Sequence, residues 1–169
     1  MESLYSVSLE KLIQEFNLEV LRGGRGYERR AIRTEDVNRP GLQLIGFFDY
    51  FDPTRIQVLG KVETTYLSGL TAEARRACFD SLLAQDIPAV VITREMEPFP
   101  ECMEMAEKYD RTILRTQETT SSFMSALIAY LRSELSPRIT RHGVLVEIYG
   151  EGILLLGESG VGKSETAIE

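Results

Sequence analysis

A string of eight residues near the end of the printed sequence constrains the fold more than any other feature. It reads GESGVGKS and matches the pattern G-x-x-x-x-G-K-[ST] at every fixed position. The apolar run 153–156 comes directly before it, and residues 165–169 can begin a helix. The sequence therefore predicts a strand, a glycine-rich loop and a helix, in that order. The string consists of Gly157, Glu158, Ser159, Gly160, Val161, Gly162, Lys163 and Ser164.

The residue types in this string suit the binding of nucleotide phosphates. Glycines let successive backbone N–H groups converge on one anion, and the helix that follows presents the positive end of its dipole to it. Lys163 is a compact cation that can reach the β- and γ-phosphates, and the Ser164 hydroxyl can coordinate Mg²⁺. The string predicts phosphoryl transfer from a nucleoside triphosphate by positioning and charge neutralisation. The alternative is a glycine-rich turn with an incidental lysine, which the preceding apolar strand disfavours.

A β-hairpin is predicted to lead into this loop. The apolar runs 143–149 and 153–156 flank Gly150-Glu151-Gly152, a turn signal. If residues 150 and 151 form a two-residue turn, Tyr149 pairs with Gly152. The second strand of the hairpin then feeds directly into the loop.

The only histidine of the chain falls next to this hairpin. In the predicted register His142 lies across from Ser159, within reach of bound phosphate, where it can donate to phosphate or shift protons. An exposed histidine at a strand end is the other interpretation, and this geometry favours neither. The candidate catalytic residues are His142 and Lys163, and the candidate metal ligand is Ser164.

The first four-fifths of the chain alternate between strand and helix patterns, which predicts an α/β domain of three-layer type with a mostly parallel sheet. Ser136-Pro137 should end the last helix, because the residue before a proline avoids the helical region. The predicted domains are 1–134, a linker at 135–141, and the incomplete start of a P-loop domain at 142–169. The predicted strands are 18–21, 56–59, 88–93 and 112–114, and the predicted helices are 9–16, one starting at Pro40, 71–86, 100–109 and 120–135.

Charge and hydropathy exclude some partners. The net charge of −7 argues against bulk affinity for nucleic acid or an anionic membrane. No apolar run approaches the roughly 18 to 20 residues that cross a bilayer, and the start of the chain lacks the pattern of a secretory signal. We expect a cytoplasmic protein.

Two other groups of residues carry weaker signals. Cys78 and Cys102 lie in helical patterns among apolar neighbours and are predicted to be reduced, buried or half-buried thiols. A zinc site is disfavoured because the chain has one histidine. Five arginines between Arg22 and Arg33 suit either a solvated loop or a contact with an anion or partner, and the two readings stay open.

Several stretches resemble one known family. Residues 142–165, from His142-Gly143-Val144 through GESGVGKSE, strongly resemble the bacterial HPr kinase/phosphorylase family. The stretches 38–42 (NRPGL), 46–48 (GFF) and 55–60 (RIQVLG) are similar to the first domain of that family. The resemblance covers essentially the whole chain, and residues 142–165 are its most specific part.

The resemblance implies a bifunctional enzyme of carbon catabolite regulation. Its members use ATP and Mg²⁺ to phosphorylate a serine of HPr, the carrier protein of the sugar phosphotransferase system. They also remove the group with inorganic phosphate, releasing pyrophosphate, and are typically homohexamers. The resemblance maps the active-site histidine of the family onto His142, its P-loop lysine onto Lys163 and its Mg²⁺-binding serine onto Ser164.

The sequence departs from the family pattern in ending five residues after the loop. The general-base aspartate of the family, a second carboxylate for Mg²⁺ and the segments that grip HPr all come later. We therefore expect a fragment that alone neither phosphorylates HPr nor binds ATP tightly.

Two alternatives remain open at this stage. One is another P-loop enzyme, such as a small GTPase or carrier ATPase, although these usually place parallel βαβ units around the loop. The other is a ligand-binding or assembly module in which residues 1–134 are the functional part. Saturable binding of nucleotides or sugar phosphates to residues 1–134 is expected only for the module.

Overall fold

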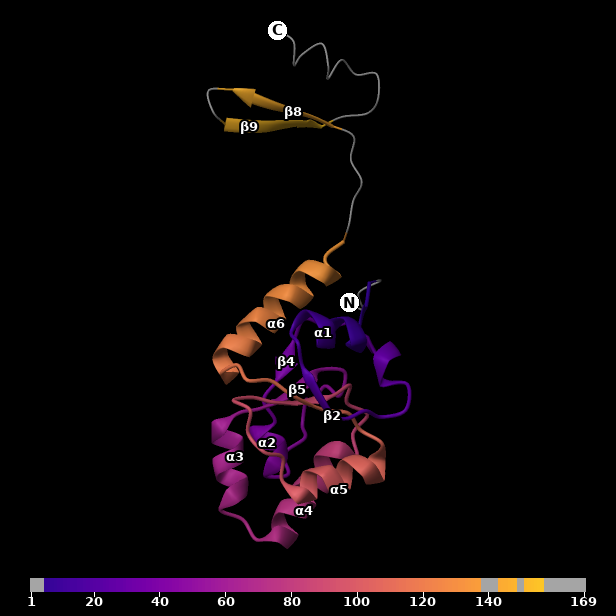
Figure 1. The fold of residues 1–169 in the computed structure, drawn as a ribbon, viewed down its shortest axis with the longest axis vertical. Helices are drawn as coiled ribbons and strands as arrows, with labels where there is room; N and C mark the ends of the chain where they lie inside the picture. Colours follow the sequence, from indigo (N-terminus) through magenta and orange to yellow (C-terminus); the bar gives the residue numbers. More distant parts are fainter. Residues whose placement is uncertain (1–4, 138–142, 149–150, 157–169) are drawn as a thin grey trace. The chain divides into compact units, whose positions relative to one another are not determined.

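The computed structural model describes residues 5–137, 143–148 and 151–156. The chain forms two compact units, residues 1–136 and 137–169, each of which has its own architecture. Figure 1 shows the first unit as a sheet with helices against both faces, and the described part of the second as a pair of strands.

A five-stranded sheet forms the centre of the first unit, in the order β2-β7-β6-β5-β4. Strands β4 to β7 run parallel to their neighbours, and β2 at one edge is antiparallel to β7. This confirms the predicted α/β fold with a mostly parallel sheet. The bounds are β2 (Glu19–Arg22), β4 (Val37–Asn38), β5 (Ile56–Leu59), β6 (Val90–Ile92) and β7 (Ile113–Arg115).

Helices cover both faces of this sheet because the central strands are apolar on both sides. Val58, Val91 and Leu114 point into one core with α1 (Leu9–Glu15) and α6 (Thr120–Leu135). Leu59, Ile92 and Ile113 point into the opposite core. The helices of that second layer are α2 (Gly41–Leu44), α3 (Lys61–Ser68), α4 (Ala72–Leu83) and α5 (Pro100–Tyr109).

Side-chain caps fix where three helices begin. The hydroxyls of Ser8, Thr71 and Thr119 accept hydrogen bonds from the backbone N–H three residues on, at 3.2, 3.2 and 3.3 Å. The predicted caps at Ser8 and Thr71 are confirmed. Helix α6 ends at Leu135, and Ser136 is extended (ψ 141°) before Pro137, as the proline predicted.

Some predicted bounds were wrong for reasons that lie outside the local sequence. Helix α4 ends at Leu83 and not at residue 86, because the Arg111 Nε–H donates to the Leu83 carbonyl oxygen at 2.8 Å and satisfies the helix end. Helix α2 begins at Gly41, with Pro40 as its N-cap and not its first residue. Helix α3 was not predicted.

Smaller elements complete the first unit. Strands β1 (Val7–Ser8) and β3 (Ala31–Ile32) form a two-stranded antiparallel sheet, and η1 (Tyr27–Arg29) is a single 3-10 turn. None of the helices in the described ranges is long and apolar enough to cross a lipid bilayer.

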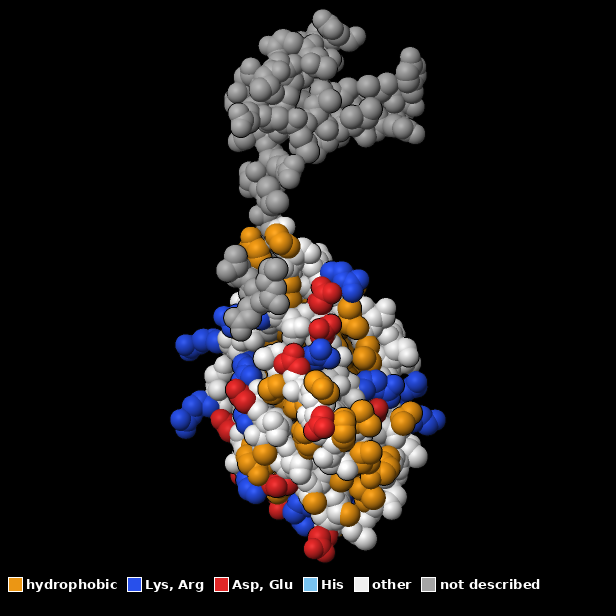
Figure 2. Space-filling view, turned by 180° about the vertical axis from the view of Figure 1, so that it is seen from behind, with side chains coloured by type: hydrophobic (Ala, Val, Ile, Leu, Met, Phe, Trp, Pro, Cys, Tyr) orange, Lys and Arg blue, Asp and Glu red, His pale blue; other side chains and the backbone are white. Residues whose placement is uncertain are grey.

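On the face that Figure 2 shows, charged side chains of both signs are spread over the first unit, and many of the apolar side chains lie in its lower right part. The large exposed hydrophobic residues on and around α2 and α3 are Leu42, Ile45, Phe47, Tyr50, Val62 and Tyr66.

Candidate functional site

The predicted hairpin before the glycine-rich loop is present. Strands β8 (Gly143–Ile148) and β9 (Glu151–Leu156) pair antiparallel, from Gly143 opposite Leu156 to Ile148 opposite Glu151. Strand β9 ends at the residue before the loop string, so the strand–loop order predicted from the sequence holds up to that point.

The register of this hairpin differs from the prediction by two residues. Tyr149 was predicted to pair with Gly152, but Gly152 pairs with Glu147, and the residues between the strands are Tyr149 and Gly150. Two-residue hairpin loops favour glycine at the first position in one turn type and at the second in another, so the glycines around Glu151 did not distinguish the two registers. Because side chains alternate with period two, the shift leaves the same residues on each face of the hairpin.

The predicted site residues themselves lie outside the described residues. They are His142, Gly157, Glu158, Ser159, Gly160, Val161, Gly162, Lys163 and Ser164. Their nearest described neighbours along the chain are Gly143 and Leu156, which face each other at the open end of the hairpin.

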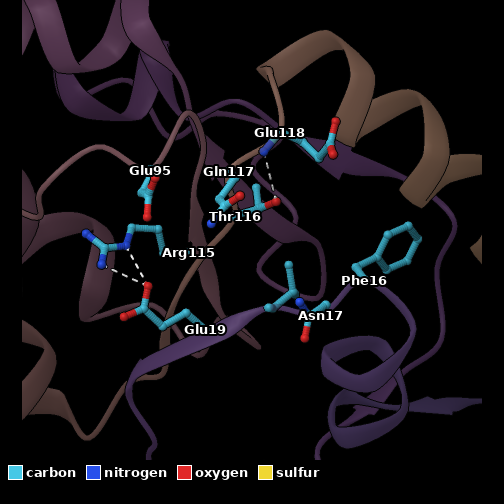
Figure 3. Close-up of a pocket in the computed structure, with 9 residues that line it drawn as sticks. Phe16, Asn17, Glu19, Glu95, Arg115, Thr116, Gln117 and Glu118 are labelled. Atoms are coloured by element: carbon cyan, nitrogen blue, oxygen red, sulfur yellow. Dashed lines mark hydrogen bonds and ion pairs between the residues drawn. The ribbon is translucent and has the colours of Figure 1, made fainter.

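The first unit contains a cavity of about 380 Å³ beside β2 and the loop after β7 (Figure 3). Its charged lining is dominated by Glu19, Glu95, Glu118 and Arg115. The Arg115 guanidinium donates to Glu19 at 2.8 Å and to Glu97 at 3.0 Å, so its charge is neutralised by carboxylates within the protein. This cavity therefore offers no unpaired cation to an anionic ligand.

No group of three His, Cys, Asp or Glu side chains in the described ranges is placed to hold a metal ion. The carboxylates around the Figure 3 cavity are not such a group, and the Thr116 hydroxyl that lines the cavity accepts a hydrogen bond from the Glu118 N–H at 3.2 Å.

Two of the five arginines in the cluster at residues 22–33 form ion pairs in the described part of the chain. The Arg22 guanidinium donates to the Arg111 carbonyl oxygen at 2.9 Å and pairs with Asp110. Arg30 pairs with Asp86 at 2.8 Å, and this hydrogen bond holds the pKa of Asp86 below its ordinary value. These two arginines fasten the loop to the body of the unit. Arg25, Arg29 and Arg33 form no ion pair within the described part of the chain.

Both cysteines are free thiols, as predicted. Cys102 is buried in the second core, and that burial raises its pKa to about 12. Because the thiolate is the reactive form, Cys102 is inert at neutral pH and serves as a small core residue. Cys78 is half-buried, and desolvation raises its pKa as well.

The sequence analysis did not identify one group of cations that the fold brings together. Arg39, Lys61 and Arg94 follow the carboxyl ends of the neighbouring parallel strands β4, β5 and β6. Strands β5 and β6 were predicted from the sequence, and a cation follows each of them within two residues. That pattern could have indicated an anion-binding site. The convergence of the cations depends on strand order, which the sequence did not supply.

Two family models match the chain. Residues 7–131 match the model described as HPr Serine kinase N terminus, and residues 133–169 match the model described as HPr Serine kinase C-terminal domain. The two matches together cover most of the chain and divide it close to Pro137, where the two compact units divide.

Curated relatives show the same likeness. An HPr kinase/phosphorylase of Caldicellulosiruptor bescii is 51% identical over 98% of this chain and 53% of the relative. One of Caldanaerobacter subterraneus subsp. tengcongensis is 48% identical over 96% of this chain and 53% of the relative. One of Clostridium perfringens is 45% identical over 96% and 52%. The chain spans about half the length of the curated relatives it matches.

A solved structure resembles this fold with a TM-score of 0.51 and 18% identity, over 76% of this chain and 50% of that chain. It contains the CBS and DRTGG domains of the regulatory region of Clostridium perfringens pyrophosphatase, complexed with the activator diadenosine tetraphosphate. At that identity the likeness concerns the fold alone.

Proposed function

Because this chain belongs to the HPr serine kinase family, we propose that a protein carrying it at the length of its relatives is a bifunctional HPr kinase/phosphorylase. It phosphorylates a serine of HPr with ATP and removes the phosphate with inorganic phosphate, releasing pyrophosphate. The observation that carries this proposal is the string GESGVGKS, directly after strand β9 and inside the segment that matches the C-terminal family model. The alternative of a small GTPase or carrier ATPase has no comparable support.

The residues present suit ATP and Mg²⁺. Strand β9 ends at Leu156, so the loop that begins at Gly157 follows a strand, as a phosphate-binding loop must. Backbone N–H groups of residues 157–162 would cradle the phosphates, Lys163 would bind their β- and γ-oxygens, and Ser164 would hold the metal. The metal would neutralise charge on the phosphates.

His142 comes directly before β8, and the glycine-rich loop comes directly after β9. The described neighbours of the two along the chain, Gly143 and Leu156, are paired at the open end of the hairpin. Histidine can donate a hydrogen bond to phosphate and shift a proton near neutral pH. We therefore assign His142 a role in moving a proton or contacting phosphate during transfer.

The division of labour follows the chain. Residues 1–134 form the N-terminal α/β domain, 135–141 the linker, and 142–169 the start of the kinase domain. The protein acts in the cytoplasm as a homo-oligomer, a hexamer by family resemblance, with HPr as its partner. It uses neither nucleic acid nor a membrane.

The test is a transfer assay on purified protein of the relatives' length. HPr, ATP and Mg²⁺ are mixed with it, and phosphoserine on HPr is measured by mass spectrometry. Added inorganic phosphate should then release pyrophosphate and restore unmodified HPr. ATP hydrolysis with HPr left unmodified would instead place the chain among other P-loop enzymes. Residues 1–169 alone are expected to show no turnover.

A further inference from the structure

A cavity of about 470 Å³ lies at the carboxyl edge of the parallel sheet in the first unit. It is lined by Val62 and Thr65 of α3, by Ser121 and Thr120 at the start of α6, and by three cations. The cations are Arg39, Lys61 and Arg94, from the ends of β4, β5 and β6.

Charge sets this cavity apart from the rest of the unit. Most Lys and Arg side chains in the described ranges pair with a carboxylate, but Lys61 and Arg94 have no ion-pair partner there. Among the described residues that line the cavity there is no carboxylate, although the chain carries a net charge of −7. Two uncompensated cations at one cavity repel each other, which an anion between them would relieve.

The third cation, Arg39, is held by a buried carboxylate. Arg39 Nη2 donates to the Glu63 carboxylate at 2.9 Å, and Glu63 is only 6% exposed. Glu63 also accepts the Gly60 N–H at 2.8 Å, which fixes the turn into α3. A guanidinium has five N–H donors, so Arg39 keeps others for a ligand.

The backbone at Arg94 has an uncommon conformation. Arg94 and Glu95 both adopt left-handed conformations, with φ of 59° and 52°, which L-residues with long side chains rarely do. Their N–H groups donate to the Glu118 and Thr116 carbonyl oxygens, each at 2.8 Å, so the segment is tied to the loop after β7. Strained residues held by their surroundings cluster at ligand sites.

Buried hydrogen bonds connect the elements that meet at the carboxyl edge of the sheet. The Thr93 hydroxyl lies 3.2 Å from the Leu59 carbonyl oxygen and 2.7 Å from the Thr120 hydroxyl, all buried. These contacts join the ends of β5 and β6 to the first turn of α6. The first-turn N–H groups of α3 and α6 add positive potential beside the cations.

We propose that this cavity is a binding site for a phosphorylated small molecule, separate from the glycine-rich loop. Lys61, Arg94 and Arg39 bind the phosphate dianion, the hydroxyl of Ser121 donates to its oxygens, and Val62 packs against the rest of the ligand. The site is in the first unit and does not depend on the function proposed for the second.

The test is an NMR titration of the whole chain at constant ionic strength, with inorganic phosphate, glycerol 3-phosphate and uncharged glycerol as probes. Saturable amide shifts are expected at residues 60–65, 93–95 and 119–122 with both phosphates and not with glycerol. Tighter binding of glycerol 3-phosphate would identify an ester as the ligand class, and equal binding would identify the phosphate group alone.

Variants separate this site from other anion binding. Arg94→Gln and Lys61→Gln remove exposed cations and should each weaken binding at least about tenfold. Arg29→Gln removes an exposed cation elsewhere and should not, and Lys163→Ala should leave these shifts intact while removing any at residues 157–164. Absence of saturable shifts at the strand edge, or equal weakening by Arg29→Gln, would overturn the proposal.

Discussion

The hydroxyl oxygens of Thr93 and Thr120 lie 2.7 Å apart in the interior of the first unit, joining the end of β6 to the first turn of α6. Replacing either by valine leaves the other hydroxyl buried with one fewer partner. We expect each variant to lower the free energy of unfolding by about 1 to 3 kcal/mol in urea denaturation. The exposed neighbour Ser121→Ala should change it by less than about 0.5 kcal/mol. A valine variant as stable as the parent would show that this contact does not hold the edge.

Gly60 has no room for a side chain. A Cβ there would lie 2.5 Å from Thr120 Oγ1 and 2.9 Å from Arg39 Nη2. Gly60→Ala should therefore destabilise the unit by about 1 to 3 kcal/mol through overpacking. Gly41→Ala is the matched control, because nothing lies within 4 Å of its Cβ position. Equal stability of the two variants would contradict the close packing of the strand edge.

The Arg75–Glu101 ion pair between α4 and α5 should make stability depend on pH. The hydrogen bond from Arg75, at 3.0 Å, holds the pKa of Glu101 below its ordinary value of 4.5. A carboxyl with a lowered pKa in the folded state stabilises the protein above its unfolded pKa, and this contribution is lost as pH falls through the folded pKa. Glu101→Gln should thus cost more stability at pH 7 than at pH 3, measured by denaturation at both. An equal cost at both pH values would mean that the charge of Glu101 is unimportant.

Local signals in the sequence predicted much of the first unit. Helix α5 has the bounds expected from its pattern, and the Ser8 and Thr71 caps lie where expected. The short helix α3 was missed because its β-branched residues, Val62, Thr64 and Thr65, disfavour helix. Its start also depends on the contact of Glu63 with Gly60.

Other features depended on partners far along the chain. The end of α4 depends on Arg111, which lies 28 residues beyond Leu83. The strand-edge cations converge only once the order β4-β5-β6 is known. The prediction of the hairpin was correct, but its register was not. The glycines on either side of Glu151 allowed two registers, and the sequence did not distinguish them.

In a protein as long as the curated relatives, His142→Ala should reduce kcat for HPr phosphorylation by about a hundredfold or more, as expected for loss of a proton-transfer group. Thermal unfolding should show a Tm close to that of the parent, because the change replaces one side chain ahead of β8, which begins at Gly143. Parental kcat in the variant would leave the histidine without a role in transfer.

Lys163→Ala, assayed in both directions with purified HPr, tests the phosphotransfer account most directly. One cation serves the same phosphates in kinase and phosphorylase reactions, so both rates should fall by about a hundredfold or more. Lys108→Ala removes a surface lysine paired with Asp80 and should leave both rates unchanged. An unchanged rate in either direction for Lys163→Ala would contradict the assignment of GESGVGKS as the phosphate-binding loop.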